Sequence, residues 1–219
     1  MRANDLFIIF ALPFHSIRAS QPMSNMSVES DRTAWDRSTA LPERTELSFE
    51  FETLWRSLPT DGLVPRREAF RPERAPRFLR HLVLAEARLN VPSICIRLSG
   101  TEFDARLQTC LTGANYLEFV SEADRPLVIA RARDIVERPC GIWEIRETHY
   151  ERGYAQLVEN TSFPLRSGHG GVDLLLVLTQ PLGGSINLKS THGKIARTKP
   201  TKLCRYIDLS EIPSQLSQV

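Results

Sequence analysis

Residues 93–120 carry the pattern that most constrains the fold of this chain. Apolar and polar side chains alternate over residues 94–98, which is the period of a half-buried strand. Gly100 interrupts the strand, and Thr101-Glu102-Phe103-Asp104 then predicts a capping box that starts a short helix. Gly113 predicts a left-handed stop for that helix. The stretch thus predicts a strand, a sharp turn and short helices. It contains no catalytic group, so it constrains the fold more than the function.

The neighbouring segments extend this pattern to a five-stranded antiparallel sheet. Residues 81–89 also alternate, and a turn at 90–92 joins them to the first strand as a hairpin. A helix is predicted from Asp124, because Pro126 is tolerated in a first turn. Three more strands are predicted at 141–150, 154–165 and 172–180. We therefore expect an α+β domain with short helices on one face of the sheet and a leading helix on the other.

The leading helix has one apolar face, which predicts an interface. Its stripe consists of Leu47, Phe51, Leu54, Trp55 and Leu58. A helix of about three turns is marginal in water alone, so this face must bury against something. It either covers its own sheet or meets a second subunit, and we expect Phe51, Leu54, Trp55 and Leu58 to form the interface of a homodimer.

The ends of the chain are expected to lie outside this domain. Residues 1–42 are predicted to be a disordered or mis-called extension, with translation starting at Met23 or Met26; a signal peptide and an ordered piece of the fold are the alternatives. Residues 43–182 are the expected domain, and residues 183–219 a basic, loop-like tail that either is solvated or contacts an acidic partner.

Composition excludes several classes of function. The net charge of +2 does not imply a polyanionic partner. Six arginines within residues 63–80 are interpreted as a solvated loop rather than a nucleic-acid-binding patch, because only two aromatics are interleaved. The four cysteines include no Cys-x-x-Cys pair, so we expect neither a zinc site nor a disulfide framework, and a cytoplasmic location without membrane contact.

Short motifs in a particular order carry a resemblance to a known family. They are Leu54-Trp55 followed by Leu58-Pro59, Phe78-Leu79-Arg80-His81-Leu82, Arg97-Leu98-Ser99-Gly100-Thr101, Leu111-Thr112-Gly113, and Glu159 followed by Pro164-Leu165. Over residues 47–182 the chain resembles a PAS domain, in particular the stand-alone bacterial PAS-like proteins. The resemblance implies a sensory or interaction module that takes part in signal transduction, with no assigned ligand. Cys110 lacks the flanking residues of the flavin-photosensor cysteine motif.

A ligand cavity between helices and sheet is the first candidate site. Its predicted walls are Phe103, Leu107, Tyr116, Phe119 and Trp143, although the same residues would also make an ordinary core. Glu159 lies on a mostly apolar strand face, where an unpaired carboxylate is costly. We expect it to pair with Arg97 or Arg146, or to bind the ligand.

An enzymatic function is the alternative. Glu147 and His149 share a strand face and could form an acid–base pair, and Glu159 is a further candidate for this role. Because His149 lies at a strand end, we favour a surface residue over a base or a haem ligand. No nucleophile elbow, phosphate loop, dinucleotide fingerprint or metal-binding helix motif occurs. We therefore predict a non-enzymatic module that binds a small ligand of unknown identity or an unidentified signalling protein. We expect neither haem, flavin nor metal, and no nucleic acid.

Overall fold

The computed structural model describes residues 42–107, 110–168, 171–183 and 194–210, with the side chains of Arg106 and Leu107 outside the description. Residues 1–41, most of the expected extension, lie outside these ranges. The helices are α1 Glu46–Arg56, α2 Pro76–Leu79, α3 Thr101–Leu107 and α4 Arg125–Glu137, with single 3-10 turns at η1 Arg67–Ala69, η2 Pro72–Arg74 and η3 Tyr116–Phe119. The strands are β1 Leu82–Arg88, β2 Ser93–Ser99, β3 Gly141–Tyr150, β4 Ala155–Arg166, β5 Val172–Pro181 and β6 Ile195–Ile207.

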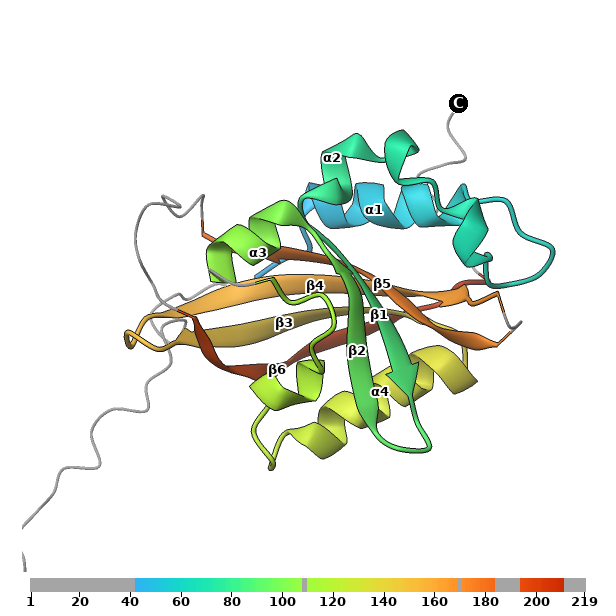
Figure 1. Cartoon of the computed structure of the whole chain (residues 1–219). Coiled ribbons are helices and arrows are strands. Elements are labelled where there is room, and N and C mark those ends of the chain that lie inside the picture. The colour runs from blue at the N-terminus through green and yellow to red at the C-terminus, as the bar shows by residue number, and fades with distance from the viewer. Residues whose placement is uncertain (1–41, 108–109, 169–170, 184–193, 211–219) are drawn as a thin grey trace, which may run out of the picture. The chain divides into compact units, whose positions relative to one another are not determined.

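The strands form one antiparallel sheet in the order β2-β1-β5-β4-β3-β6 (Figure 1). The hairpin of β1 and β2 and the three later strands form as predicted, and α3, η3 and α4 connect the two groups. This is the PAS-like α+β fold that the sequence predicted.

The sixth strand corrects two expectations. The sheet has six strands rather than five, and residues 195–207 of the expected loop-like tail form β6, which pairs with β3 along its length. Among the described strands, β6 pairs fully with β3 alone, and this outer strand carries the basic residues Lys199, Lys202 and Arg205. Only Thr198 and Pro200 of β6 are buried, so the strand carries no apolar alternation and its sequence looks like that of a solvated loop.

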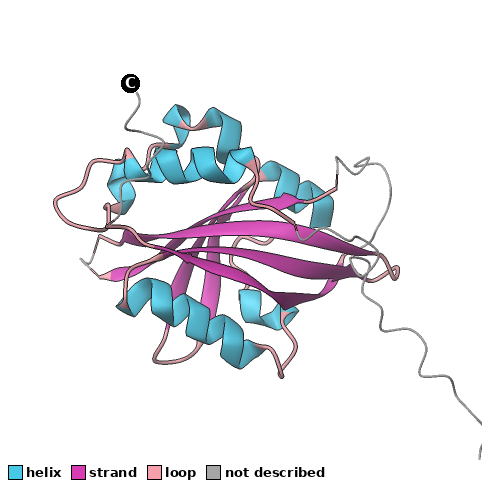
Figure 2. Cartoon of the chain, turned by 180° about the vertical axis from the view of Figure 1, so that it is seen from behind, coloured by secondary structure: helices cyan, strands magenta, loops and turns pink. Residues whose placement is uncertain are grey.

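Helices cover both faces of the sheet, as Figure 2 shows from behind. On one face, α1 and α2 pack on alternate residues of the central strands. The cluster contains Phe51 and Phe78 of the helices and Leu82, Leu84, Phe163, Leu165, Leu174, Leu176 and Leu178 of the strands. On the other face α4 lies over Ala85, Ile142 and Leu175. The near-continuous apolar run of β5 is thus buried on both sides, as predicted.

Three contacts fasten α1 to β4. Thr45, the N-cap of α1, donates from its hydroxyl to Glu159 at 2.6 Å. The hydroxyls of Ser48 and Thr161 are 2.5 Å apart. The indole of Trp55 donates to the carbonyl oxygen of Pro164 at 2.9 Å. Hydrogen bonds from the start to the end of α1 therefore hold the helix along β4.

The same arrangement corrects the predicted interface. Phe51 and Trp55 are 0% and 3% exposed because they pack into the chain's own core, where Trp55 stacks on Phe163 with ring centroids 5.1 Å apart. The helix covers its own sheet, and these two aromatics are not available to a second subunit. The homodimer stays a prediction, with only the partly buried Leu54 and Leu58 left from its expected interface.

The segment after β2 differs from its predicted capping pattern. Gly113 has the expected positive φ of 92°, but α3 already ends at Leu107. Asp104 accepts hydrogen bonds from the Ser99 hydroxyl and the Leu111 amide instead of closing a capping box. Gly100 is needed for close approach, since a Cβ there would lie 2.5 Å from the carbonyl oxygen of Arg80.

Residues 111–120 also touch both outer strands of the sheet. Gly113 donates from its amide to Ile96 of β2, and the Ala114 carbonyl accepts from the Ile96 amide. At the other end of the segment Val120 forms a parallel bridge with Thr198 of β6. One connection thus contacts the two strands that lie farthest apart in the sheet order.

Trp55→Ala tests whether α1 belongs to the core. The substitution removes a buried indole and its hydrogen bond, so we expect the free energy of unfolding to fall by about 3–5 kcal/mol in urea titrations. Phe49→Ala, on the same helix but 50% exposed, is the matched control and should cost about 1 kcal/mol or less. Equal small losses for both variants, with a change from dimer to monomer only for Trp55→Ala, would show that the stripe is an interface.

Candidate functional site

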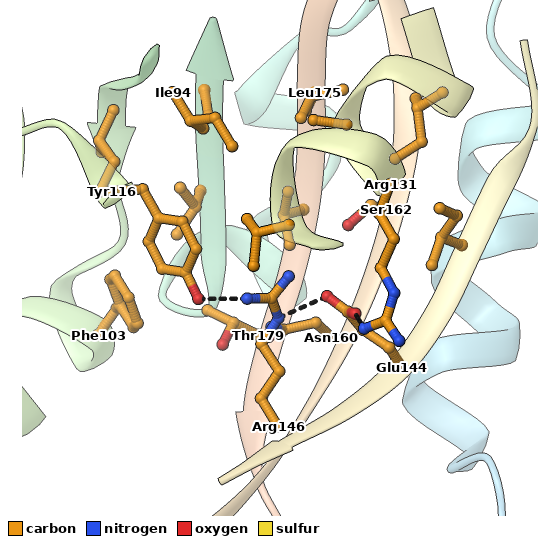
Figure 3. A pocket seen from close by; sticks show the side chains of 18 residues that line it. Ile94, Phe103, Tyr116, Arg131, Glu144, Arg146, Asn160, Ser162, Leu175 and Thr179 are labelled. Atoms are coloured by element: carbon orange, nitrogen blue, oxygen red, sulfur yellow. Dashed lines mark hydrogen bonds and ion pairs between the residues drawn. The ribbon is translucent and has the colours of Figure 1, made fainter. Parts of the chain in front are cut away.

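A cavity of about 100 Å³ lies between α4 and the sheet (Figure 3). Its apolar wall includes Val83, Ala85, Ile94, Val128, Ala132, Ile135 and Leu175. A second hollow of about 40 Å³ shares Phe103, Tyr116, Arg146, Asn160 and Thr179 with it. Since a cavity of about 150 Å³ accepts a guest the size of benzene, this space suits a ligand of a few heavy atoms.

A buried ion network forms the polar side of the cavity. The Glu144 carboxylate accepts from Arg131 of α4 on one oxygen and from Nε of Arg146 on the other. Arg146 also donates from Nη1 to the hydroxyl of Tyr116 at 2.7 Å, and Arg131 donates to the carbonyl oxygen of Thr201 of β6 at 3.3 Å. The three charged residues are 4–8% exposed. The network therefore joins α4, β3, β6 and η3 around the cavity.

Strand and helix periods place these groups together. Glu144 pairs with Asn160 of β4, and Asn160 pairs with Thr179 of β5, so the three side chains form one row across the cavity face. Arg131 lies one turn after Val128 and one turn before Ile135, in the buried stripe of α4. An arginine inside an apolar helical stripe is the sequence signal that would have pointed to this site.

Electrostatics keep the Arg146 guanidinium charged. Burial acts to lower its pKa, but the neighbouring Glu144 carboxylate and the Tyr116 hydroxyl outweigh burial and raise the pKa above its ordinary value. The ring of Tyr116 also lies under the guanidinium, with Cζ 5.3 Å from the ring centroid. The cavity therefore holds a permanent positive charge at all accessible pH values.

The structure brings together only part of the predicted ligand site. Phe103 and Tyr116 line the cavity, whereas Phe119 packs beside them without lining it. The side chain of Leu107 lies outside the described residues. Trp143 and Glu159 lie on the opposite face of the sheet, because side chains of β3 and β4 alternate and their neighbours Glu144 and Asn160 take the cavity side.

Glu159 has different partners from those expected. Its carboxylate accepts from the Thr45 amide at 3.0 Å, from the Trp143 indole at 2.5 Å and from the Gln180 amide, besides the Thr45 hydroxyl. Neither predicted arginine contributes, because Arg97 pairs with Glu86 and Arg146 with Glu144. Neutral donors thus satisfy this buried carboxylate and hold the start of α1.

The residues of the enzymatic alternative lie away from the cavity. Nε2 of His149 is 3.5 Å from the Glu147 carboxylate, on the same face of β3 as Trp143. Glu147 is 3% exposed, and neither it nor His149 lines either hollow. This pair therefore does not face the space where a small substrate fits.

The cysteines and acidic groups offer no obvious metal site in the described ranges. All four cysteines are free thiols. Within residues 42–107, 110–168, 171–183 and 194–210, no three His, Cys, Asp or Glu side chains gather as metal ligands do. No helix of the described residues is long and apolar enough to span a membrane.

Comparisons with known proteins give distant structural neighbours. No protein-family model and no curated protein matches the chain. Among solved structures, it is similar to a light-oxygen-voltage domain studied with a flavin analogue, at 15% identity and TM-score 0.40, over 51% of this chain and 83% of that one. An RNA-binding light-oxygen-voltage receptor is 19% identical at TM-score 0.40, over 57% and 35% of the two chains. The Vibrio cholerae VqmA dimer is 15% identical at TM-score 0.40, over 52% and 53%.

The chain spans about a third of the RNA-binding receptor and about half of VqmA. At these identities and TM-scores the likeness says nothing about the function of this chain.

Glu144→Gln tests the ion network. The substitution leaves two buried guanidinium groups without their shared carboxylate, so we expect a loss of about 3–5 kcal/mol in the free energy of unfolding. Glu137→Gln is the matched control on α4, because Glu137 pairs with Arg133 at 3.7 Å with both side chains more than half exposed, and it should cost less than about 1 kcal/mol. Similar urea midpoints for the two variants would contradict the structural role of Glu144.

Cysteine labelling tests the burial of the thiols. Burial, together with the Asp134 carboxylate, raises the pKa of Cys140 to about 11, and burial also raises the pKa of Cys204. A raised pKa lowers the reactive thiolate fraction, to about one part in a thousand for Cys140 at pH 8. We expect iodoacetamide to modify the exposed Cys110 first, and Cys140 and Cys204 only in urea, as peptide mass spectrometry would show. Equal rates for Cys110 and Cys140 in the folded protein would refute this order.

Proposed function

We propose that this chain is a PAS-like sensory module of the stand-alone bacterial kind, which binds a small ligand between α4 and the sheet and relays the signal by protein contact. The observation that carries the proposal is the cavity with its buried ion network. Three charged groups are kept out of water there although each is costly to bury, and they surround a space that side chains do not fill.

The central strand β4 offers a physical route from the cavity to a partner. Asn160 faces the cavity, while its neighbours Glu159 and Thr161 hold α1 on the opposite face. A ligand that shifts Asn160 therefore acts on the strand between two anchors of α1. We propose that α1, with the exposed Phe49 on its outer side, is part of the surface that an unidentified signalling protein or a second copy of the chain reads.

The proposed module runs from residue 43 through the end of β6, and it is not an enzyme. The proposed domain extends beyond the predicted end at residue 182, because β6 pairs with β3 and supplies Thr201 to the ion network. Glu147, His149 and Glu159, the residues of the enzymatic alternative, do not line the cavity. We also propose a cytoplasmic location, which the free cysteines support.

Native mass spectrometry of the purified protein tests ligand binding. We expect a small colourless molecule to accompany the protein, or a fragment library to yield binders that raise the melting temperature. Ala132→Leu fills the cavity and should abolish this binding, whereas Ala130→Leu, on the exposed side of the same helix, should preserve it. A bound haem or flavin, or binding unaffected by Ala132→Leu, would overturn the proposal.

A further inference from the structure

The charges around the cavity do not balance. Arg131 and Arg146 contribute two positive charges, and Glu144 is the one carboxylate among the described residues that line either hollow. Asp134 of α4 is paired with Arg138 and accepts from Tyr206. A net positive charge in an interior of low polarity is costly, so a negative charge inside the cavity would be stabilised.

The polar groups of the cavity also leave hydrogen-bonding positions open. Arg146 uses Nε for Glu144 and Nη1 for Tyr116, and Figure 3 draws bonds from only these two of its three guanidinium nitrogens. Figure 3 draws no bond from Nη2 to any of the other residues that line the cavity. Oδ1 of Asn160 is likewise buried without a partner there, although Asn160 lines both hollows. A rotation of the side-chain amide by half a turn exchanges its oxygen and nitrogen, so Asn160 can present a donor.

Apart from Ser162 and Thr179, the rest of the cavity lining is apolar. Ile94 and Leu175 lie at one end of the view in Figure 3, and Arg146, Asn160 and Thr179 lie at the other. An occupant that satisfies both ends has a compact oxyanion group and a small hydrocarbon body. The volume of about 100 Å³ limits the whole molecule to a few heavy atoms.

We infer that the cavity binds a short-chain monocarboxylate, with its carboxylate on Arg146 and Asn160 and its hydrocarbon part against Ile94, Val128 and Leu175. This inference rests on the proposed function and names the class of ligand for it. A guanidinium matches a carboxylate in shape and charge, so it favours the acid over a neutral amide of the same size. Glu144 holds the guanidinium in place for that contact.

Isothermal titration of the wild-type protein with matched pairs of ligands tests the inference. The probes are acetate, propionate and isobutyrate, each against its primary amide, at pH 7 in a buffer without carboxylates. We expect isobutyrate to bind at least tenfold more tightly than isobutyramide, and the affinity to rise from acetate to isobutyrate as the apolar wall is filled. Equal or tighter binding of the amide, or no acid binding at 10 mM, would overturn the inference.

A variant pair locates the contact. Arg146→Lys keeps the charge but loses the planar fork, so the preference for acid over amide should fall at least fivefold. Arg133→Lys, an exposed site on α4, should leave the preference unchanged. An unchanged preference in Arg146→Lys would overturn the assignment of the carboxylate to Arg146, and the wild-type comparison decides the ligand class even where that variant does not fold.

The outcomes separate this inference from the proposed function. A neutral molecule that binds and is excluded by Ala132→Leu, with no acid binding, would overturn the carboxylate inference and leave the sensory module standing. An empty cavity in native mass spectrometry, with no binding of any fragment, acid or amide, would overturn both.

Discussion

The Glu144 carboxylate is the interaction on which the arrangement around the cavity depends. It meets two guanidinium groups, one from α4 and one from β3, and through them it reaches Tyr116 and the backbone of β6. Each guanidinium is costly to bury, and together they are held by one carboxylate and a few neutral acceptors. The position of α4 over the sheet is thus set by charge as well as by apolar contact. The cavity between α4 and the sheet lies beside these three charged side chains.

The sheet itself could be predicted from the sequence because its period is short and local. The strands that became β1 to β5 alternate or run apolar, and the turns between them carry glycine, proline or asparagine. β6 could not be found in this way. It has a full partner on one side only, and it contains Pro200, which an outer strand tolerates because its free edge needs no amide donor.

The candidate site could be predicted only in part, because strand period gives two faces without saying which one meets the cavity. Phe103 and Tyr116 come from short helical segments and line the cavity, and their role in ligand binding stays a prediction. The sequence predicts Trp143 and Glu159 in the cavity wall, but it is their neighbours Glu144 and Asn160 that face the cavity. That parity depends on how the sheet meets α4, which is a long-range property. The partners of Glu159 were missed for the same reason, since Thr45 and Gln180 are distant in sequence.

The connection at residues 111–120 has a consequence for how this protein behaves at high concentration. An antiparallel sheet with two open edges presents unpaired backbone groups that can pair with another chain. Here the backbone of residues 113–115 occupies part of the edge of β2, and Val120 occupies part of the edge of β6. The basic side chains along β6 add mutual repulsion between copies. Residues 111–120, part of the stretch from which the fold was predicted, thus protect both edges of the sheet against pairing with another chain.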